Sequence, residues 1–220
     1  DAFAIHLYAD GTPAPGWPAG GMPVAPTPGH QLGPLLAPDS EGGVLVLYVQ
    51  AGSNPDVRIR RLTSDGLIHP GWPADDVALN IGPSWQGSRI MGDGAGGAYH
   101  VWMDDRTRPS GASFSPSYLD LYAQHVRADG VLDPAWPLGG LAITTAPEEQ
   151  SEPVVVPDQA GGFVVVWEDL RNYATTGWDV YALRIRADGT VYPGWPSEGR
   201  PVSRAPEYHW RTRACEDGTG

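Results

Sequence analysis

Acidic and basic side chains recur together at one kind of position in this sequence. Residues 102–106 (WMDDR) and 167–171 (WEDLR) share a Trp-x-Asp-x-Arg pattern. Residues two apart on a strand share a face, so Asp104 with Arg106, and Asp169 with Arg171, can bond each other or a neighbouring strand. Because the pattern recurs whereas a catalytic site is usually single, it favours structural ion pairs. The alternative is a carboxylate site for acid/base chemistry or for a cation.

Glycoside cleavage is the acid/base chemistry that these carboxylates would suit. It needs two carboxyl groups about 5 to 9 Å apart. A glycosidase or lyase built on this chain would draw them from Asp104, Asp105, Glu168 and Asp169 around a central channel. If each of these side chains is instead held by an Arg of the same sheet, the hypothesis fails.

Aspartate also opens a recurring apolar segment, at Asp1, Asp56, Asp120 and Asp179. These residues could cap the loop that precedes each segment. A Ca²⁺ site would need several converging oxygens, and the sequence lacks the D-x-D-x-D-G run of an EF-hand. No cofactor is expected, and calcium is the one ion kept open.

Histidines do not show a metal-binding pattern. The sixth position of the same segment alternates between the two basic types, as His6, Arg61, His125 and Arg184. With His30, His69, His100 and His209 there are six His in all, none in an H-x-x-x-H or H-E-x-x-H spacing. His100 and His125 are expected inside a sheet or at its interface. There is no G-x-S-x-G, P-loop or dinucleotide fingerprint either.

A repeat sets the positions of all these residues. Its most regular marker is a Trp that lies six residues after the Gly of an Asp-Gly pair, at Trp17, Trp72, Trp136 and Trp195. Successive copies are separated by 55, 64 and 59 residues. A period of this length is typical of repeat architectures. The regular recurrence of these Trp residues predicts a packing role.

Each repeat contains four strand-like pieces, which we call a, b, c and d. The 29 Gly, the 23 Pro and the short Val-rich runs predict an all-β fold. Four antiparallel strands per repeat of 55–64 residues indicate a β-propeller blade. Residues 26–80, 81–144 and 145–203 are complete blades by this alignment.

The two ends of the sequence match only parts of a blade. Residues 1–25 match pieces c and d, and residues 204–220 match piece a with its turn. Together they lack strand b, which would leave backbone groups unpaired in a closed disc. We therefore expect a segment of a larger propeller, whose further blades come from the same or another chain.

The loops of each blade divide into two kinds. Tight turns such as 93–97 (DGAGG) and 158–162 (DQAGG) join a to b, whereas the b-c loops 51–55, 106–118 and 171–178 vary in length. A meander places these two kinds at opposite ends of the strands, and variable loops on a rigid scaffold often carry function. Seven aromatic or His side chains that fall in the b-c loops or d-to-a links are candidates for ligand binding: Trp85, Tyr118, Tyr173, Trp178, Tyr208, His209 and Trp210. They could stack on a sugar or a peptide, or fill gaps between blades.

The repeat resembles a known family. P-x-V-x-x-D-x-x-G-G-x-x-V-x-W-x-D-x-R, then D-x-Y-A-x-R-x-x-A-D-G and G-W-P-x-x-G, is similar to the repeat of large secreted bacterial β-propeller proteins. The resemblance covers essentially the whole chain and implies a secreted or cell-surface location. The blade at 26–80 departs from it, because Tyr48, Gln50 and Gly52 replace Trp, Asp and Arg.

Charge and composition exclude several classes of function. The net charge is −12, and all fourteen basic residues are Arg, so binding to nucleic acid or to an anionic membrane is not expected. No apolar run reaches the length of a membrane span, and the single Cys215 allows no intrachain disulfide. The leading hypothesis is a non-catalytic extracellular propeller for binding or structural display, which meets a glycan or protein with its variable loops. The alternatives are the glycosidase or lyase above and a structural subunit of a cell-surface assembly.

Overall fold

Strands make up nearly all of the regular structure. The computed structural model describes residues 1–25, 29–52, 55–79, 86–204 and 212–218. The strands are β1 (Phe3–Ala4), β2 (Met22–Pro23), β3 (Gln31–Pro38), β4 (Val44–Gln50), β5 (Asp56–Leu62), β6 (Val77–Ala78), β7 (Gln86–Gly92), β8 (Ala98–Asp104), β9 (Asp120–Val126), β10 (Leu141–Thr144), β11 (Gln150–Pro157), β12 (Phe163–Asp169), β13 (Asp179–Ile185) and β14 (Arg200–Ser203). Two single-turn helices, η1 (Pro116–Tyr118) and α1 (Tyr173–Thr176), lie in b-c loops. Among the described residues no helix is long and apolar enough to cross a membrane.

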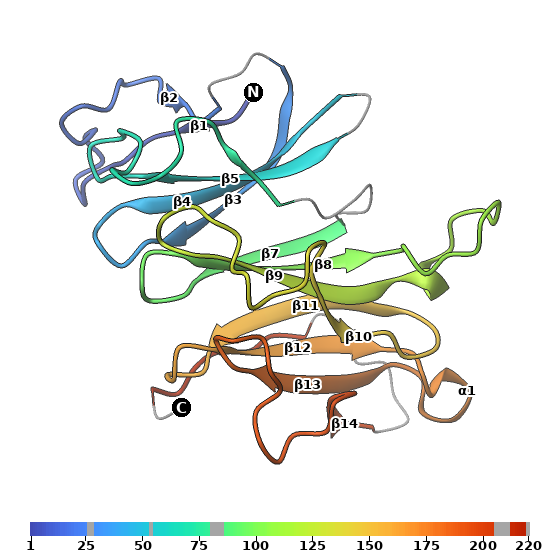
Figure 1. Ribbon diagram of the computed structural model, residues 1–220. Coiled ribbons are helices and arrows are strands. Elements are labelled where there is room, and N and C mark those ends of the chain that lie inside the picture. The colour runs from blue at the N-terminus through green and yellow to red at the C-terminus, as the bar shows by residue number, and fades with distance from the viewer. Residues whose placement is uncertain (26–28, 53–54, 80–85, 205–211, 219–220) are drawn as a thin grey trace. The chain divides into compact units, whose positions relative to one another are not determined.

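The strands form antiparallel meanders, as Figure 1 shows. Three sheets have four strands each, in the orders β3-β4-β5-β6, β10-β9-β8-β7 and β11-β12-β13-β14, and β1 pairs with β2 in a two-stranded sheet. The predicted all-β fold with four-stranded antiparallel blades is confirmed. In every four-stranded sheet the pieces follow one another in space as they do in sequence, so the a-b turn and the b-c loop lie at opposite ends of the strands.

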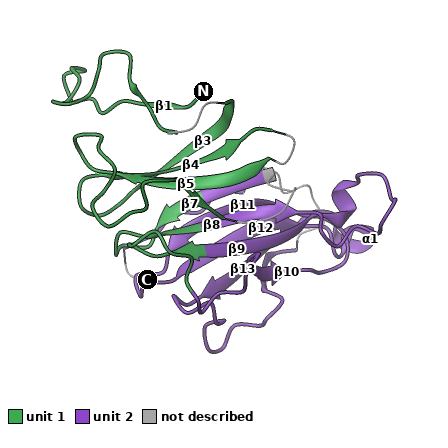
Figure 2. Cartoon of the chain, turned by 45° about the horizontal axis from the view of Figure 1, so that its top comes forward, with its two compact units in different colours: residues 1–83, 90–99, 125–133 green, residues 84–89, 100–124, 134–220 purple. Residues whose placement is uncertain are grey.

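The chain forms two compact units, coloured separately in Figure 2. Unit 1 contains residues 1–83, 90–99 and 125–133, and unit 2 contains residues 84–89, 100–124 and 134–220. In unit 1 the segment 1–25 is held by apolar contacts, because Ala2, Trp17 and Val24 are buried in one cluster with Val46 and Tyr48 of β4. Their burial removes apolar surface from water, which stabilises the association.

The core of unit 2 is built on the central strands. The side chains of Trp102 on β8 and Trp167 on β12 are fully buried. They stack on Tyr122 and Tyr181 of the adjacent strands, with ring centroids 6.1 and 6.0 Å apart. Such cross-strand aromatic pairs stabilise a sheet beyond the area that they bury.

The turn between strands a and b is organised by an aspartate in each sheet. One carboxylate oxygen accepts two backbone N–H groups of the turn, and the other accepts from the basic residue at the sixth position of strand c. The pairs and their side-chain distances are Asp39 with Arg61 at 2.9 Å, Asp93 with His125 at 3.0 Å, and Asp158 with Arg184 at 2.9 Å. The alternation of Arg and His noted in the sequence therefore serves this turn.

The repeated Trp packs on the c-d turn of the next repeat, a contact that we call the Trp clamp. The indole N–H of Trp17 donates to the carbonyl of Ser64 at 2.7 Å, and that of Trp136 donates to the carbonyl of Ala187 at 3.0 Å. The turn glycine beside the ring has a positive φ, at which a side chain would be strained, and it lies close to the ring. A Cβ on Gly189 would lie 3.3 Å from the Trp136 ring.

The other two copies of this Trp differ in exposure. Trp72 is buried, and a Cβ added to Gly130 would lie 3.2 Å from its ring. Trp195 is half-buried, with the Arg200 guanidinium 5.0 Å from its ring centroid.

Candidate functional site

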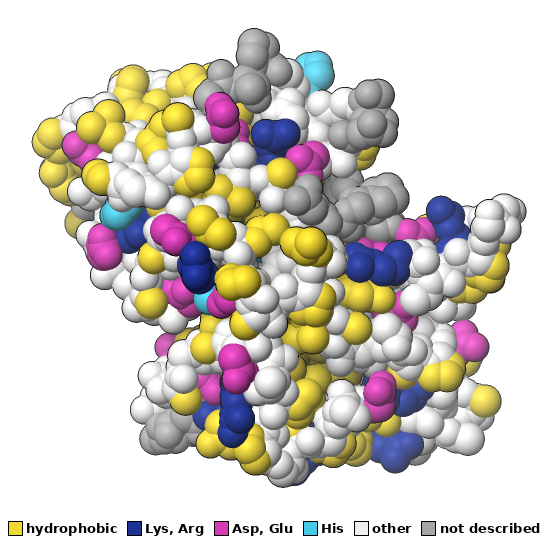
Figure 3. Space-filling view, viewed as in Figure 1, with side chains coloured by type: hydrophobic (Ala, Val, Ile, Leu, Met, Phe, Trp, Pro, Cys, Tyr) yellow, Lys and Arg dark blue, Asp and Glu magenta, His cyan; other side chains and the backbone are white. Residues whose placement is uncertain are grey.

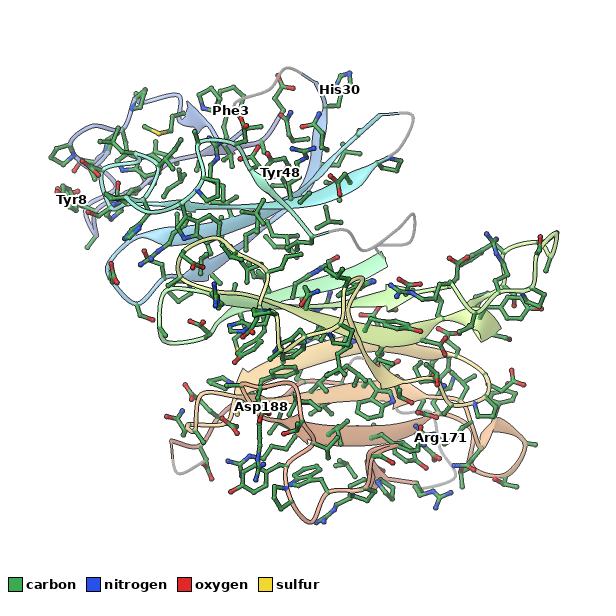
Figure 4. All side chains as sticks on the ribbon, viewed as in Figure 1. Phe3, Tyr8, His30, Tyr48, Arg171 and Asp188 are labelled. Atoms are coloured by element: carbon green, nitrogen blue, oxygen red, sulfur yellow. The ribbon has the colours of Figure 1, made fainter. Side chains whose placement is uncertain are left out.

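The Trp-x-Asp-x-Arg motif closes on itself within each sheet. Asp169 receives hydrogen bonds from the Trp167 indole at 2.8 Å and from Arg171 Nε and Nη2 at 2.8 and 2.6 Å. The Arg171 guanidinium also lies over the Tyr181 ring, 4.1 Å from its centroid, and Figure 4 shows Arg171 at the end of the β11–β14 sheet. Both carboxylate oxygens are therefore engaged by the motif itself.

The copy on β8 has the same geometry. Asp104 accepts from the Trp102 indole at 2.9 Å and from Arg106 at 2.9 and 2.6 Å, and Arg106 lies 3.9 Å from the centroid of Tyr122. Asp105, the next residue, pairs with Arg108 at 3.2 Å. The hypothesis that Asp104, Asp105 and Asp169 serve as glycosidase carboxylates is therefore wrong, because each is already bonded to an Arg of its own sheet or loop.

The blade that lacks the motif has a different buried network. Tyr48 on β4 replaces the Trp, and its hydroxyl donates to Asp76, which also pairs with Arg60 of β5. Burial, followed by the hydrogen bond to Asp76, raises the pKa of Tyr48 well above its ordinary value. Asp76 thus takes over from the missing strand-b aspartate, and it comes from the c-d connection.

The aspartates that open strand c contact the b-c loop or a nearby Arg. Asp179 accepts from the Asn172 amide at 2.9 Å, Asp120 accepts from the Thr107 hydroxyl at 2.8 Å, and Asp56 pairs with Arg58 at 3.3 Å. Asp1 is exposed. Across the described ranges no group of three or more His, Cys, Asp or Glu could hold a metal ion.

The charge of Asp120 is costly in the folded protein. It is 4% exposed, and burial raises its pKa to about 6, with the Asp104 charge adding to the rise against Thr107 and Arg106. Between about pH 4 and about pH 6 the unfolded chain releases this proton while the folded chain keeps it. The free energy of unfolding should therefore fall as the pH rises through that window.

Asp120→Asn should remove this pH-dependent loss. We expect the variant to be more stable than the wild type by about 1–3 kcal/mol at pH 8 and to match it at pH 4, because Asn keeps an acceptor for Thr107 without a charge. Urea unfolding at both pH values measures the difference. The exposed Asp75→Asn is the control and should show no gain. Equal stability of Asp120→Asn and wild type at pH 8 would contradict the assignment.

Three glutamates line one cleft of unit 2, which we call the acidic cleft. It has a volume of about 570 Å³. Its lining residues are Met103, Phe114, Pro116, Leu119, Glu149, Ser151, Glu152, Glu168, Trp178 and Arg213. The carboxylates thus share a hollow with aromatic and apolar side chains, an arrangement typical of small-ligand sites.

Strand pairing fixes the positions of the cleft carboxylates. Glu168 lies on the central strand β12, opposite Ser151 on β11 and Val180 on β13. Its side chain is buried and accepts the backbone N–H of Thr212 at 3.2 Å. Glu149 immediately precedes β11, and its carbonyl accepts from the Leu170 N–H at 2.9 Å. The end of β12 and the start of β11 therefore bring Glu149 and Glu168 to one place.

The surroundings of Glu149 favour the protonated form of its carboxyl group. Burial raises the pKa of its carboxyl group, and the charges of Glu168 and Glu152 raise it further, while a hydrogen bond with Ser151 opposes them. Paired carboxyl groups whose environments separate their pKa values are the usual means of assigning one as acid and the other as base. Glu149 is accordingly the acid candidate.

Glu152 adopts a backbone conformation that other blades reserve for glycine. Its φ is 49°, in the left-handed region, beside a register shift in the β11–β12 pairing. Counted back from the turn aspartate, Gly33 and Gly87 occupy the same position, with φ of 57° and 59°. A side chain costs about 1 kcal/mol there, so this repeat holds a carboxylate at the cleft in a strained conformation.

Glu152→Gly should therefore stabilise the protein. We expect a gain of about 0.5–1 kcal/mol in the free energy of unfolding, because glycine adopts this φ without strain. The lost ion pair with Arg89 is largely exposed and worth little. Glu152→Gln keeps the strain and removes only the charge, so equal stability of the two variants in urea unfolding would count against this explanation.

Few of the predicted ligand-binding residues reach the acidic cleft. Trp178 lines it, whereas Tyr118 at the end of η1 and the exposed Tyr173 on α1 do not. The remaining predicted residues, Trp85, Tyr208, His209 and Trp210, lie outside the described part of the chain.

Sequence reasoning missed Glu149, Glu152 and Phe114. A signal was present, because the d-to-a link 145–152 (TAPEEQSE) is rich in Glu and its counterparts in the other blades are not. Of the strand-b carboxylates Asp104, Asp105, Glu168 and Asp169, Glu168 is the one that lines the cleft.

Comparisons with known proteins found similar chains among solved structures. No protein-family model and no curated protein matches the chain. Among solved structures, it is similar to an alpha-L-arabinofuranosidase from Lactobacillus brevis, at 13% identity and a TM-score of 0.45, over 78% of this chain and 58% of that chain. A thermostable family-43 glycoside hydrolase is similar at 13% identity and a TM-score of 0.40, over 76% and 55%.

A third similar structure is longer still. A xylan beta-1,4-xylosidase from Bacillus halodurans C-125 matches at 16% identity and a TM-score of 0.39, over 79% of this chain and 32% of that chain. The chain thus spans between a third and three fifths of the structures named here. These proteins are named as glycoside-cleaving enzymes, a finding that contradicts the prediction of a non-catalytic propeller for binding or display. That prediction is corrected accordingly.

Proposed function

We propose that the acidic cleft of unit 2 cleaves a glycosidic bond. The observation that carries this proposal is the pair Glu149 and Glu168, two carboxyl groups that line one cleft while burial and neighbouring charge raise the pKa of the first. Glycosidases use two such groups on either side of the scissile bond, and a raised pKa marks the proton donor.

The two glutamates would have different roles. Protonated Glu149 would transfer its proton to the leaving oxygen as the bond from that oxygen to the anomeric carbon breaks. Deprotonated Glu168 would take a proton from the water that attacks this carbon, or would attack the carbon itself and be released by water afterwards. In both cases the products are the leaving alcohol and a free sugar.

The other cleft residues support a neutral sugar as substrate. Trp178 and Phe114 provide flat apolar faces on which a sugar ring can stack. Three glutamates beside a single Arg213 would repel an acidic sugar such as a uronate. We propose a neutral glycan as the substrate. We also propose a secreted or cell-surface location on a bacterium, where the protein can reach polymeric glycans.

A substrate screen with matched variants tests the proposal. Wild-type protein would be incubated with nitrophenyl glycosides of neutral pentoses and hexoses and with neutral polysaccharides, and released nitrophenol or reducing sugar would be measured. Turnover should be lost in Glu149→Gln and Glu168→Gln. It should persist in Glu198→Gln, because Glu198 is exposed and lies outside the cleft lining, and Arg171 bonds its backbone carbonyl, which the substitution keeps. Turnover that survives both cleft substitutions would overturn the proposal.

A further inference from the structure

A strand of unit 1 has one edge that no strand in the described part of the chain pairs with. The even-numbered residues of segment 2–8 direct their backbone groups toward the hairpin partner, since Ala2 and His6 carbonyls accept from Val24 and Ala14, and the Tyr8 N–H donates to Thr12. Backbone direction alternates along a strand. Phe3, Ile5 and Leu7 therefore direct their N–H and C=O groups to the opposite side, where no described strand pairs with them.

In the complete blade β11–β14 of unit 2, the equivalent edge belongs to β13 and pairs with β12. Segment 1–11 (DAFAIHLYADG) aligns with 179–189 (DVYALRIRADG), so Phe3, Ile5 and Leu7 correspond to Tyr181, Leu183 and Ile185. In β13 these three residues lie opposite Trp167, Val165 and Phe163 of β12.

The contrast in burial between the two segments is large. Tyr181, Leu183 and Ile185 are at most 5% exposed, whereas Phe3, Ile5 and Leu7 are 56%, 41% and 50% exposed. Apolar side chains on an open strand edge form a template for pairing with another strand.

A cavity of about 450 Å³ lies beside this edge. Its lining includes Phe3, Ile5 and His6 from the open strand, and Leu36, Val44 and Val46 from β3 and β4. Hydrophobic side chains gather over these N-terminal strands in Figure 3, and Figure 4 shows Phe3 on β1 and Tyr8 farther along the same segment. A strand laid along residues 3–7 would direct alternate side chains into this cavity.

We propose that this edge and cavity form a docking site for an extended polypeptide strand of the β4, β8 and β12 type. Such a strand carries a Gly-Gly pair followed by five mostly apolar residues, and it would pair antiparallel with residues 3–7. The register of β12 on β13 sets the pairing: an incoming Trp lies opposite Phe3, a Val opposite Ile5 and a Phe opposite Leu7. Main-chain bonds would supply affinity, and the cavity would select apolar side chains.

The first experiment uses a synthetic peptide of residues 161–169 (GGFVVVWED) with a fluorescent label. Binding to the full chain would be followed by anisotropy, and amide hydrogen exchange would be read by NMR. We expect saturable binding with new protection at Phe3, Ile5 and Leu7, and little change at Ala4 and His6, which already face the hairpin. A peptide with V165P should bind about tenfold more weakly, because proline removes a ladder donor.

A substitution in the protein provides the second arm. Ile5→Lys places a charge on the edge and should weaken the wild-type peptide about tenfold. Leu138→Lys, at a residue 87% exposed in unit 2, is the control and should leave binding unchanged.

Three results would overturn the proposal. The first is an absence of binding by a peptide that stays monomeric, and the second is protection at Ala4 and His6 in place of the odd-numbered residues. The third is a concentration-dependent dimer, seen by sedimentation and lost in Ile5→Lys, because it would show that the edge pairs with a second copy of itself. Each outcome is independent of glycoside cleavage, which belongs to the acidic cleft.

Discussion

Glu149→Gln is expected to lower the hydrolysis of a neutral glycoside by a factor of about 10² to 10⁴, the usual contribution of a general acid. Glutamine has nearly the same shape as glutamate but has no acidic proton to give to the leaving oxygen. Because burial and two neighbouring carboxylates hold the Glu149 proton to higher pH, the wild-type rate should fall with rising pH as this group ionises. The variant should lose that alkaline limb, which a pH-rate profile would record.

The leaving group provides an internal check on this assignment. A substrate with a good leaving group, such as a dinitrophenyl glycoside, needs little protonation, so its rate should fall far less in Glu149→Gln than the rate of a natural disaccharide. Glu168→Gln should slow the two substrates alike. If Glu149→Gln affected both equally, Glu149 would not be the proton donor.

Asp169→Ala is expected to destabilise the fold by about 3–5 kcal/mol, the usual effect of breaking a buried ion pair from one side. The substitution leaves the Arg171 guanidinium without its carboxylate and the buried Trp167 indole N–H without an acceptor. The Asp169 side chain is fully buried and that of Arg171 is 15% exposed, so water cannot readily replace the lost bonds. Urea unfolding followed by Trp fluorescence would measure the loss.

The second copy of the motif, Asp104 with Arg106, provides a comparison for the loss expected at Asp169. Asp104→Ala removes the same bonds, but Arg106 is 35% exposed and its charge is better solvated after the change. The loss at Asp104 should therefore be smaller than the loss at Asp169. Equal losses, or a loss under about 1 kcal/mol at Asp169, would mean that the pair contributes through packing alone.

The blade pattern could be predicted because local signals agree in it. Glycine pairs, Asp-Gly turns and Val-rich runs all indicate short strands, and each observed four-stranded sheet lies within residues 26–80, 81–144 or 145–203. Residues that recur between repeats are also the easiest to identify in the sequence. Asp104 and Asp169 stand out for that reason, and they are structural.

The acidic cleft could not be predicted in the same way. Glu149 precedes β11 and Glu152 lies within it, at positions where the other blades have no glutamate, and both lie near the register shift of β11 against β12. Glu152 is least predictable, since a left-handed φ favours glycine and the sequence alone gives no sign that a glutamate adopts it. A departure from the repeat was the useful signal, as it also was for Tyr48 and Asp76.

The Trp clamp has a consequence for how such a chain can grow. Each joint takes its indole from one repeat and its turn from the following one, as with Trp17 and Ser64 or Trp136 and Ala187. The joint is therefore directional, and at Trp72 it recurs as packing of the ring on Gly130 without an indole hydrogen bond among the described residues. A gene duplication that adds one whole period creates a new indole and a new turn together, at any point in the array. A duplication of any other length would separate an indole from its turn.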